Sequence, residues 1–220
     1  MDSTGNREAV FLGRVTASTT HEFRNVLAIV KESAGLIEDL VASGASDRPQ
    51  LAERIARAVD RIDTQVGRGA DLLTHLNRFA HSIDPVRDGT DLDQTVNQIV
   101  FLSQRLARRG RHELTVESGA GNQTVGSDSL GLQMAVYFAV ECCLETVPEG
   151  GRVSVSTART GERAAVTFTR TAADEAPLPS PETADRWSDL TSICSDLQAS
   201  VDSDDSGRSF TLSFPERETL

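Results

Sequence analysis

The chain has 220 residues, 38% of them hydrophobic and 25% charged, which is typical of a globular protein with one sizeable domain or two small ones. Its formal net charge of −11 argues against nucleic acid or an anionic membrane as the main partner. No apolar run approaches the ~20 residues needed to cross a bilayer, and the polar N-terminus lacks an apolar signal core, so we expect a cytoplasmic protein.

The first half of the chain predicts two long helices. Apolar or small residues recur at alternating steps of three and four from Leu12 to Leu40, which indicates one buried stripe. After the stop signal Ser43-Gly44, Ser46 or Asp47 can cap a second helix, whose stripe runs from Leu51 through Val66 and Leu73 to Phe79. Such a hairpin alone would leave much of both stripes in water. We therefore expect residues 1–84 to form a homodimer that closes a four-helix bundle.

The second half, residues 90–217, predicts an α+β sandwich. Asp91 can cap a helix that ends near Arg109, and a second helix is predicted at 129–146. Alternating apolar and polar residues predict strands at 112–117, 152–157, 164–169 and 209–214. Residues 171–183 are rich in proline, alanine and acids and predict a loop, and a last helix is expected at about 184–199. Helices and strands in this order form a layered sandwich.

One stretch near the N-terminus has the features of a phosphoacceptor box. The residues from Gly13-Arg14-Val15 through His21-Glu22-Phe23-Arg24-Asn25-Val26-Leu27 resemble this box of two-component histidine kinases. Leu73–Phe79 resembles the end of that family's second bundle helix, and Val147–Val153 resembles the turn after its first nucleotide-binding helix. Phe210–Pro215 resembles its last strand. The resemblance covers nearly the whole chain and implies a dimerising phosphotransfer hairpin followed by an ATPase-like α/β domain.

The position of His21 supports the phosphoacceptor role that the resemblance implies. It lies two residues after Thr19 and two before Phe23, about 200° from either stripe position on a helix, so its imidazole should point outward. Glu22 is its neighbour, and Asn25 lies one turn further on the same face. An adjacent carboxylate can orient the ring or take its proton. The resemblance implies that Glu22 assists phosphoryl transfer and that Asn25 positions water for dephosphorylation of a partner.

The chain departs from the family where a kinase holds ATP and magnesium. The resemblance implies an Asn metal ligand six residues before Pro148, but Cys142 stands there, and a thiol is a poor magnesium ligand. The glycine-rich pattern that should follow the strand ending near Thr169 is missing, since no glycine lies between Gly161 and Gly207 and Asp174 is not followed by one. We therefore expect no ATP, metal or other cofactor on this chain and no autokinase activity.

A chain with the phosphoacceptor box but without the ATP and magnesium residues resembles dimeric bacterial histidine phosphotransferases. The resemblance implies that phosphoryl passes between receiver-domain aspartates through His21, with magnesium supplied by the receiver. Two alternatives remain open: a pseudokinase scaffold that carries no phosphate, and a response-regulator phosphatase in which Asn25 positions water. Four arginines are candidate docking residues for the receiver, although three of them also suit the end of a helix: Arg24, Arg105, Arg108 and Arg109.

Overall fold

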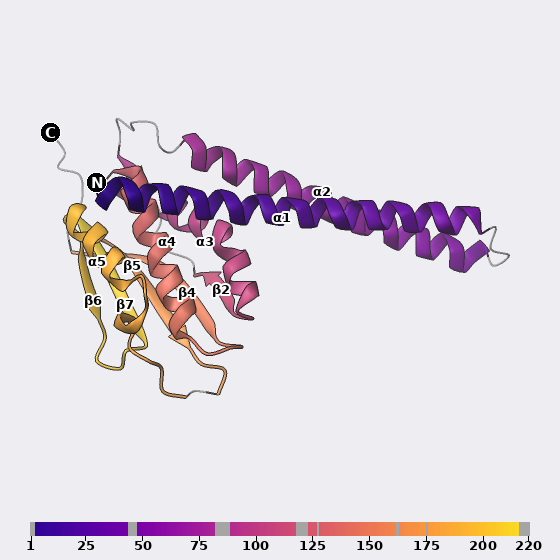
Figure 1. Ribbon diagram of the computed structural model, residues 1–220. Helices are drawn as coiled ribbons and strands as arrows, with labels where there is room; N and C mark the ends of the chain where they lie inside the picture. The colour runs from indigo at the N-terminus through magenta and orange to yellow at the C-terminus, as the bar shows by residue number, and fades with distance from the viewer. Residues whose placement is uncertain are drawn as a thin grey trace. The chain divides into compact units, whose positions relative to one another are not determined.

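The computed structural model describes residues 3–43, 48–81, 89–117, 123–126, 128–161, 163–174 and 176–215. In chain order these form helices α1 (Ser3–Ala42) and α2 (Arg48–His81), strand β1 (Thr90–Asp91), helix α3 (Leu92–Arg109), strands β2 (Glu113–Val116) and β3 (Thr124–Val125), helix α4 (Ser129–Thr146), strands β4 (Arg152–Thr160) and β5 (Arg163–Thr171), the short 3-10 helix η1 (Pro181–Thr183), helix α5 (Trp187–Asp196), and strands β6 (Ser200–Ser203) and β7 (Ser209–Pro215) (Figure 1). None of the helices in these ranges combines the length and apolar character needed to cross a membrane.

Packing divides the chain into a helical unit, Thr16–Arg78, and an α/β unit made of Met1–Val15 and Phe79–Leu220. The first segment belongs to the α/β unit because Phe11 is fully buried among aromatic rings of that unit. Its ring centroid lies 5.5 Å from that of Phe79 and 5.2 Å from that of Tyr137. The predicted division into residues 1–84 and 90–217 follows secondary structure instead, and residues 85–88 between its two parts lie outside the described residues.

The helical unit is an antiparallel hairpin of α1 and α2. Glu22 pairs with Arg68 and Glu32 with Arg61, so positions further along α1 meet earlier positions on α2. The contact surface, which we name the seam, has a seven-residue repeat: Thr19, Val26, Ser33 and Leu40 on α1, and Ala58, Gln65 and Leu72 on α2. All are buried except Gln65, which is half-buried. The four α1 seam residues belong to the predicted stripe, whereas Thr16 of that stripe is exposed. On α2 the prediction was wrong for Val66 and Leu73, which are 55% and 53% exposed. Gln65 and Leu72 take the seam positions instead.

The α/β unit is built on a five-stranded sheet in the order β2-β4-β5-β7-β6. β2 runs parallel to β4, and the other neighbours are antiparallel. Gly161 turns β4 into β5 and Gly207 turns β6 into β7, each at a φ of +64°, a backbone angle that glycine adopts without steric cost. A separate two-stranded sheet joins β1 and β3. The α+β class expected from the sequence is confirmed.

Helices α3, α4 and α5 pack side by side against the larger sheet (Figure 1). α4 is the central one and is buried almost all round, from Leu132 to Val140 without a break. A helix that is apolar on every side belongs in a core, and this one separates the sheet from the first segment of α1. Its Tyr137 and Phe138 therefore contact Phe11, while its other side faces the strands.

Several predicted boundaries agree with the structure. The Asp91 carboxylate accepts a hydrogen bond from the backbone N–H of Gln94 and caps α3 as expected. α4 spans the predicted residues, whereas α5 is shorter than the predicted 184–199, because the chain turns at Gln198 with φ +55° and continues as β6. The sequence did not predict β6, since its four residues include only one apolar side chain, Val201. The predicted cap at Ser46 or Asp47 lies outside the described residues.

Candidate functional site

His21 lies on α1 with its side chain exposed, as the spacing predicts. Asn25 is exposed one turn later, and its Nδ2 atom lies 3.4 Å from Nδ1 of His21. Residues four apart on a helix are neighbours on one face, which explains the contact. The arrangement holds one side of the imidazole against an amide and leaves Nε2 directed away from it. His21 therefore presents a ring nitrogen that a partner protein can reach.

The neighbouring carboxylate is engaged elsewhere. Glu22 faces the seam, its side chain is 9% exposed, and it accepts a hydrogen bond from the Arg68 guanidinium of α2. This ion pair ties the two helices together next to His21. The role predicted for Glu22 at the His21 ring stays a prediction, and this contact does not support it. Arg68 was not identified from the sequence, because its contact with Glu22 depends on how the two helices pair.

The position that would hold a metal in a kinase does not fit magnesium. Cys142 on α4 is fully buried, and burial raises the pKa of its thiol to about 12, so the sulfur stays protonated. A protonated thiol is not a ligand for a hard cation. Asp174, after β5, accepts a hydrogen bond from the backbone N–H of Ala176 in a local exposed turn. Among the described residues no cluster of three or more His, Cys, Asp or Glu side chains could hold a metal ion.

An arginine fills the interior next to this position. Arg170, near the end of β5, has no exposed surface and donates hydrogen bonds to Thr146 Oγ1 and to the backbone carbonyl of Gly207. Thr146 in turn donates to the carbonyl of Cys142 at 2.6 Å. Burial lowers the pKa of Arg170. Sequence reasoning missed this residue, although alternation with Val166 and Phe168 was the available signal that it points inward.

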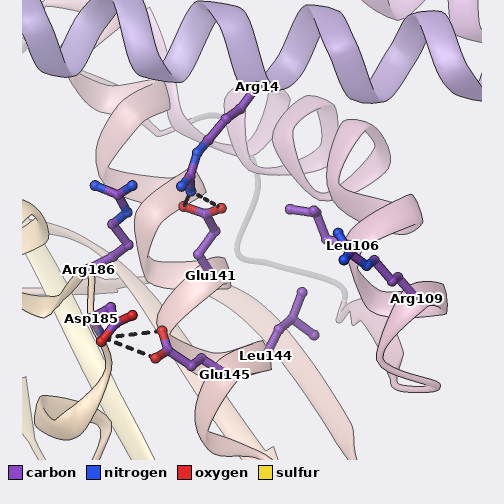
Figure 2. Close-up of a pocket in the computed structure, with 8 residues that line it drawn as sticks. All are labelled: Arg14, Leu106, Arg109, Glu141, Leu144, Glu145, Asp185 and Arg186. Atoms are coloured by element: carbon purple, nitrogen blue, oxygen red, sulfur yellow. Dashed lines mark hydrogen bonds and ion pairs between the residues drawn. The ribbon is translucent and has the colours of Figure 1, made fainter.

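The α/β unit also contains a cleft of about 650 Å³ (Figure 2). It is lined by Arg14, Leu106, Arg109, Glu141, Leu144, Glu145, Asp185 and Arg186. Figure 2 shows Arg14 of α1 reaching Glu141 of α4, where its Nη1 atom lies 2.6 and 2.7 Å from the two carboxylate oxygens. Glu145 accepts from the backbone N–H of Asp185 at 3.2 Å. The charges of Glu141 and Glu145 are thus partly used within the protein. None of the described residues that line the cleft is a glycine that could cradle phosphates.

The Arg14–Glu141 pair should give stability a distinctive pH dependence. Burial raises the pKa of Glu141, while Arg14, Arg186 and the Tyr137 hydroxyl oppose that shift by stabilising the carboxylate. In Arg14→Ala the pKa of Glu141 rises further, so the ionised carboxylate costs stability at neutral and higher pH. We expect the free energy of unfolding of Arg14→Ala to be lower near pH 8. The loss should be limited to about 1–2 kcal/mol, because the pair is partly exposed.

The same loss should vanish below the pKa of an unfolded glutamate, about 4.3, because Glu141 is then protonated in both states. Urea titrations between pH 4 and pH 8 measure this. Arg24→Ala, which removes an exposed arginine from the same helix, is the matched control and should change little at any pH. A loss in Arg14→Ala that grows as the pH falls would contradict the assigned pairing.

The predicted docking arginines are placed as follows. Arg24 is exposed on α1. Arg105 is half-buried, and Arg108 and Arg109 are exposed, in the last turns of α3. Arg109 also lines the cleft. The C-terminus of a helix favours cations in any case, so their role in docking stays a prediction.

No protein-family model matches the chain, and no curated protein matches its sequence. Among solved structures, the histidine kinase AdeS of Acinetobacter baumannii is 10% identical, covering 90% of this chain and 98% of its own, with a TM-score of 0.48. The catalytic domain of histidine kinase ThkA is 15% identical, covering 58% of this chain and 94% of its own, with a TM-score of 0.48. ThkA in complex with the response regulator protein TrrA is 14% identical, covering 95% of this chain and 63% of its own, with a TM-score of 0.45.

All three are histidine kinases, the family that the residues around His21 resemble. At these identities and TM-scores the likenesses carry no inference about activity. That inference depends on this chain's own residues.

Proposed function

We propose that this protein is a histidine phosphotransferase of two-component signalling, which carries phosphoryl on His21 between receiver-domain aspartates and does not use ATP. The observation that carries the proposal is the exposed His21–Asn25 pair on a helical hairpin, in a chain whose kinase metal position is the buried thiol of Cys142. On this proposal His21 is the nucleophile, and the buried thiol at the kinase metal position argues against ATP as its phosphoryl donor. The proposed donor is a second protein.

The chemistry needs one neutral imidazole and an acyl phosphate. The lone pair of Nε2 of His21 attacks the phosphorus of a receiver phosphoaspartate, the P–O bond to the aspartate breaks, and its electron pair stays on the leaving carboxylate. The same steps in reverse pass phosphoryl to a second receiver. Magnesium at the receiver aspartate neutralises charge on the transferring group, so this chain has to supply only the histidine and a surface for docking.

The proposal includes a homodimer formed through one side of the hairpin. Five large apolar side chains of the helical unit stay 51–64% exposed: Leu27 and Val41 on α1, and Val59, Val66 and Leu73 on α2. Each directly follows a seam residue, so each lies about 100° around its helix from the seam. Because the helices are antiparallel, this offset turns both rows to the same side. Pairing that side with a second copy would remove the apolar surface from water.

The phosphoacceptor lies on the other side of the hairpin. His21 directly precedes Glu22, and Asn25 directly precedes Val26, so both are turned about 100° from the seam in the opposite direction. Dimerisation through the apolar side would therefore leave His21 open to a receiver. The candidate docking arginines would add attraction to an acidic receiver surface, which increases the rate of encounter more than it increases affinity.

Phosphotransfer from receiver domains tests the proposal. Receivers carrying a radioactive phosphoryl group on their aspartate are mixed with the parent protein, His21→Ala and His75→Ala, a half-buried histidine of the same hairpin. We expect label on the parent and on His75→Ala but none on His21→Ala. ATP with magnesium alone should label none of them. Absence of label on the parent from every receiver tested would contradict the proposal and favour a scaffold.

A phosphatase is the second candidate, because Asn25 is exposed beside His21 and its amide can position water. In the same assay a phosphatase would remove phosphate from the receiver with the parent protein and with His21→Ala, but not with Asn25→Ala.

A further inference from the structure

We propose that the cleft in the α/β unit binds a small zwitterion, a molecule in which an apolar chain joins an ammonium group to a carboxylate. The cleft encloses about 650 Å³, a volume typical of sites that take small molecules. The described residues that line it all belong to the α/β unit, and His21 is not among them. The proposal therefore goes beyond phosphotransfer and does not depend on it.

The charged groups of the cleft are balanced, with three arginines and three carboxylates among its described lining residues, and most of them have a partner within the protein. Arg14 donates to the two carboxylate oxygens of Glu141 at 2.6 and 2.7 Å. Arg186 donates to Asp189 at 2.8 Å, and the carboxylate of Glu145 accepts from a backbone N–H. A ligand that relied on these groups would have to compete with their internal partners.

Two charged side chains of the lining are left for a ligand, Arg109 of α3 and Asp185, which lies just before α5. Both are exposed, and neither side chain forms a hydrogen bond or ion pair with any described residue. Figure 2 shows them on opposite sides of the cleft. A ligand with a single charge would match one of them and leave the other unmatched, whereas a zwitterion matches both.

The surface between these two charges is apolar. Leu106 and Leu144 line the cleft and are half-buried, and Leu144 lies between Arg109 and Asp185 in Figure 2. An alkyl chain laid against the leucines would remove apolar surface from water. At its ends, a carboxylate suits the paired donors of the Arg109 guanidinium, and an ammonium suits the carboxylate of Asp185. An ω-amino acid, whose two charged groups lie at opposite ends of an alkyl chain, has this chemistry.

Titration calorimetry of the full-length protein with glycine, γ-aminobutyrate and ε-aminocaproate tests the proposal. Glycine has no chain to span the leucines, so we expect binding only by a longer member of the series, with a dissociation constant of roughly 1 mM. Caproate and hexylamine each keep the alkyl chain and one of the two charges. Both should bind at least about fivefold more weakly than ε-aminocaproate, because one charge of the cleft stays unmatched.

Substitutions at the two charges identify the site. Arg109→Gln and Asp185→Asn should each weaken binding of the zwitterion by roughly five- to tenfold, the effect of one charged hydrogen bond in a partly exposed cleft. Arg108→Gln and Glu182→Gln are the matched controls, since both residues are exposed and lie outside the described lining. These two variants should bind as the parent does.

Absence of binding by every ω-amino acid tested would overturn the proposal. Caproate that binds as tightly as ε-aminocaproate would also overturn it, because the cleft would then be a site for simple anions. Equal affinity in the parent, Arg109→Gln and Asp185→Asn would place the ligand elsewhere. No phosphoryl group is present in these titrations, so their result and that of the phosphotransfer assay are independent.

Discussion

A lysine in place of Val66 should convert the proposed dimer into a monomer. Val66 is 55% exposed at the centre of the row of apolar residues on α2, between Val59 and Leu73. In a symmetric dimer the substitution occurs in both copies, so two apolar contacts are lost and two charges are placed in an apolar interface. Each buried valine contributes about 1.5 kcal/mol or more, and the charges add to the cost, so the dissociation constant should rise by at least about 100-fold. Light scattering at micromolar concentration measures the change directly.

Leu36→Lys is the matched control for this substitution. Leu36 is also exposed, at 40%, but it comes three residues after Ser33 and so lies toward the His21 side of the hairpin. This variant should remain a dimer. A monomeric parent, or a dimer that tolerates lysine at Val66 and not at Leu36, would show that the proposed side of the hairpin is not the interface.

Removal of the Arg170 side chain should produce a large loss of stability in the α/β unit. The guanidinium is fully buried and donates to Thr146 Oγ1 and to the carbonyl of Gly207. Arg170→Ala leaves both acceptors without this donor and opens a cavity beside Cys142 and Cys143. These two effects together should reduce the free energy of unfolding by about 3 kcal/mol, measured by urea denaturation.

Two further variants make this result interpretable. Arg170→Met keeps most of the side-chain volume without the hydrogen bonds, so it should lose less than Arg170→Ala. Arg152→Ala removes an exposed arginine whose partner is Glu113, also exposed, and should cost less than about 1 kcal/mol. Equal small losses in all three variants would mean that the interior at Arg170 tolerates its removal, contrary to the packing described above.

The sequence predicted those features that depend on neighbours along the chain. The stripe predicted from Leu12 to Leu40 included the α1 seam residues Thr19, Val26, Ser33 and Leu40, and the same periodicity placed His21 outside it. The Asp91 cap and the apolar character of α4 identified two helices of the α/β unit with accurate boundaries. Periodicity and capping are local signals, so one strand or helix is enough to reveal them.

The features that were missed depend on residues far apart in the chain. Glu22 meets Arg68 only when α1 and α2 pair in this register, and Arg14 meets Glu141 across 127 positions. The sequence suggested that Glu22 acts on the adjacent His21, whereas in the structure Glu22 is buried and pairs with Arg68 of α2. Arg170 was similarly obscured, because an arginine in a strand is usually exposed and only its inward register shows that it is buried.

The location of the phosphoryl group after transfer from a labelled receiver tests the proposed role of His21 directly. Cleavage after Arg14 and Arg24 releases the peptide Val15–Arg24, in which His21 is the only histidine. We predict that the label is in this peptide, and that it is lost in acid and kept in alkali, as a P–N bond requires. Label on another histidine, or an acid-stable label on a serine or threonine of the peptide, would contradict the role assigned to His21.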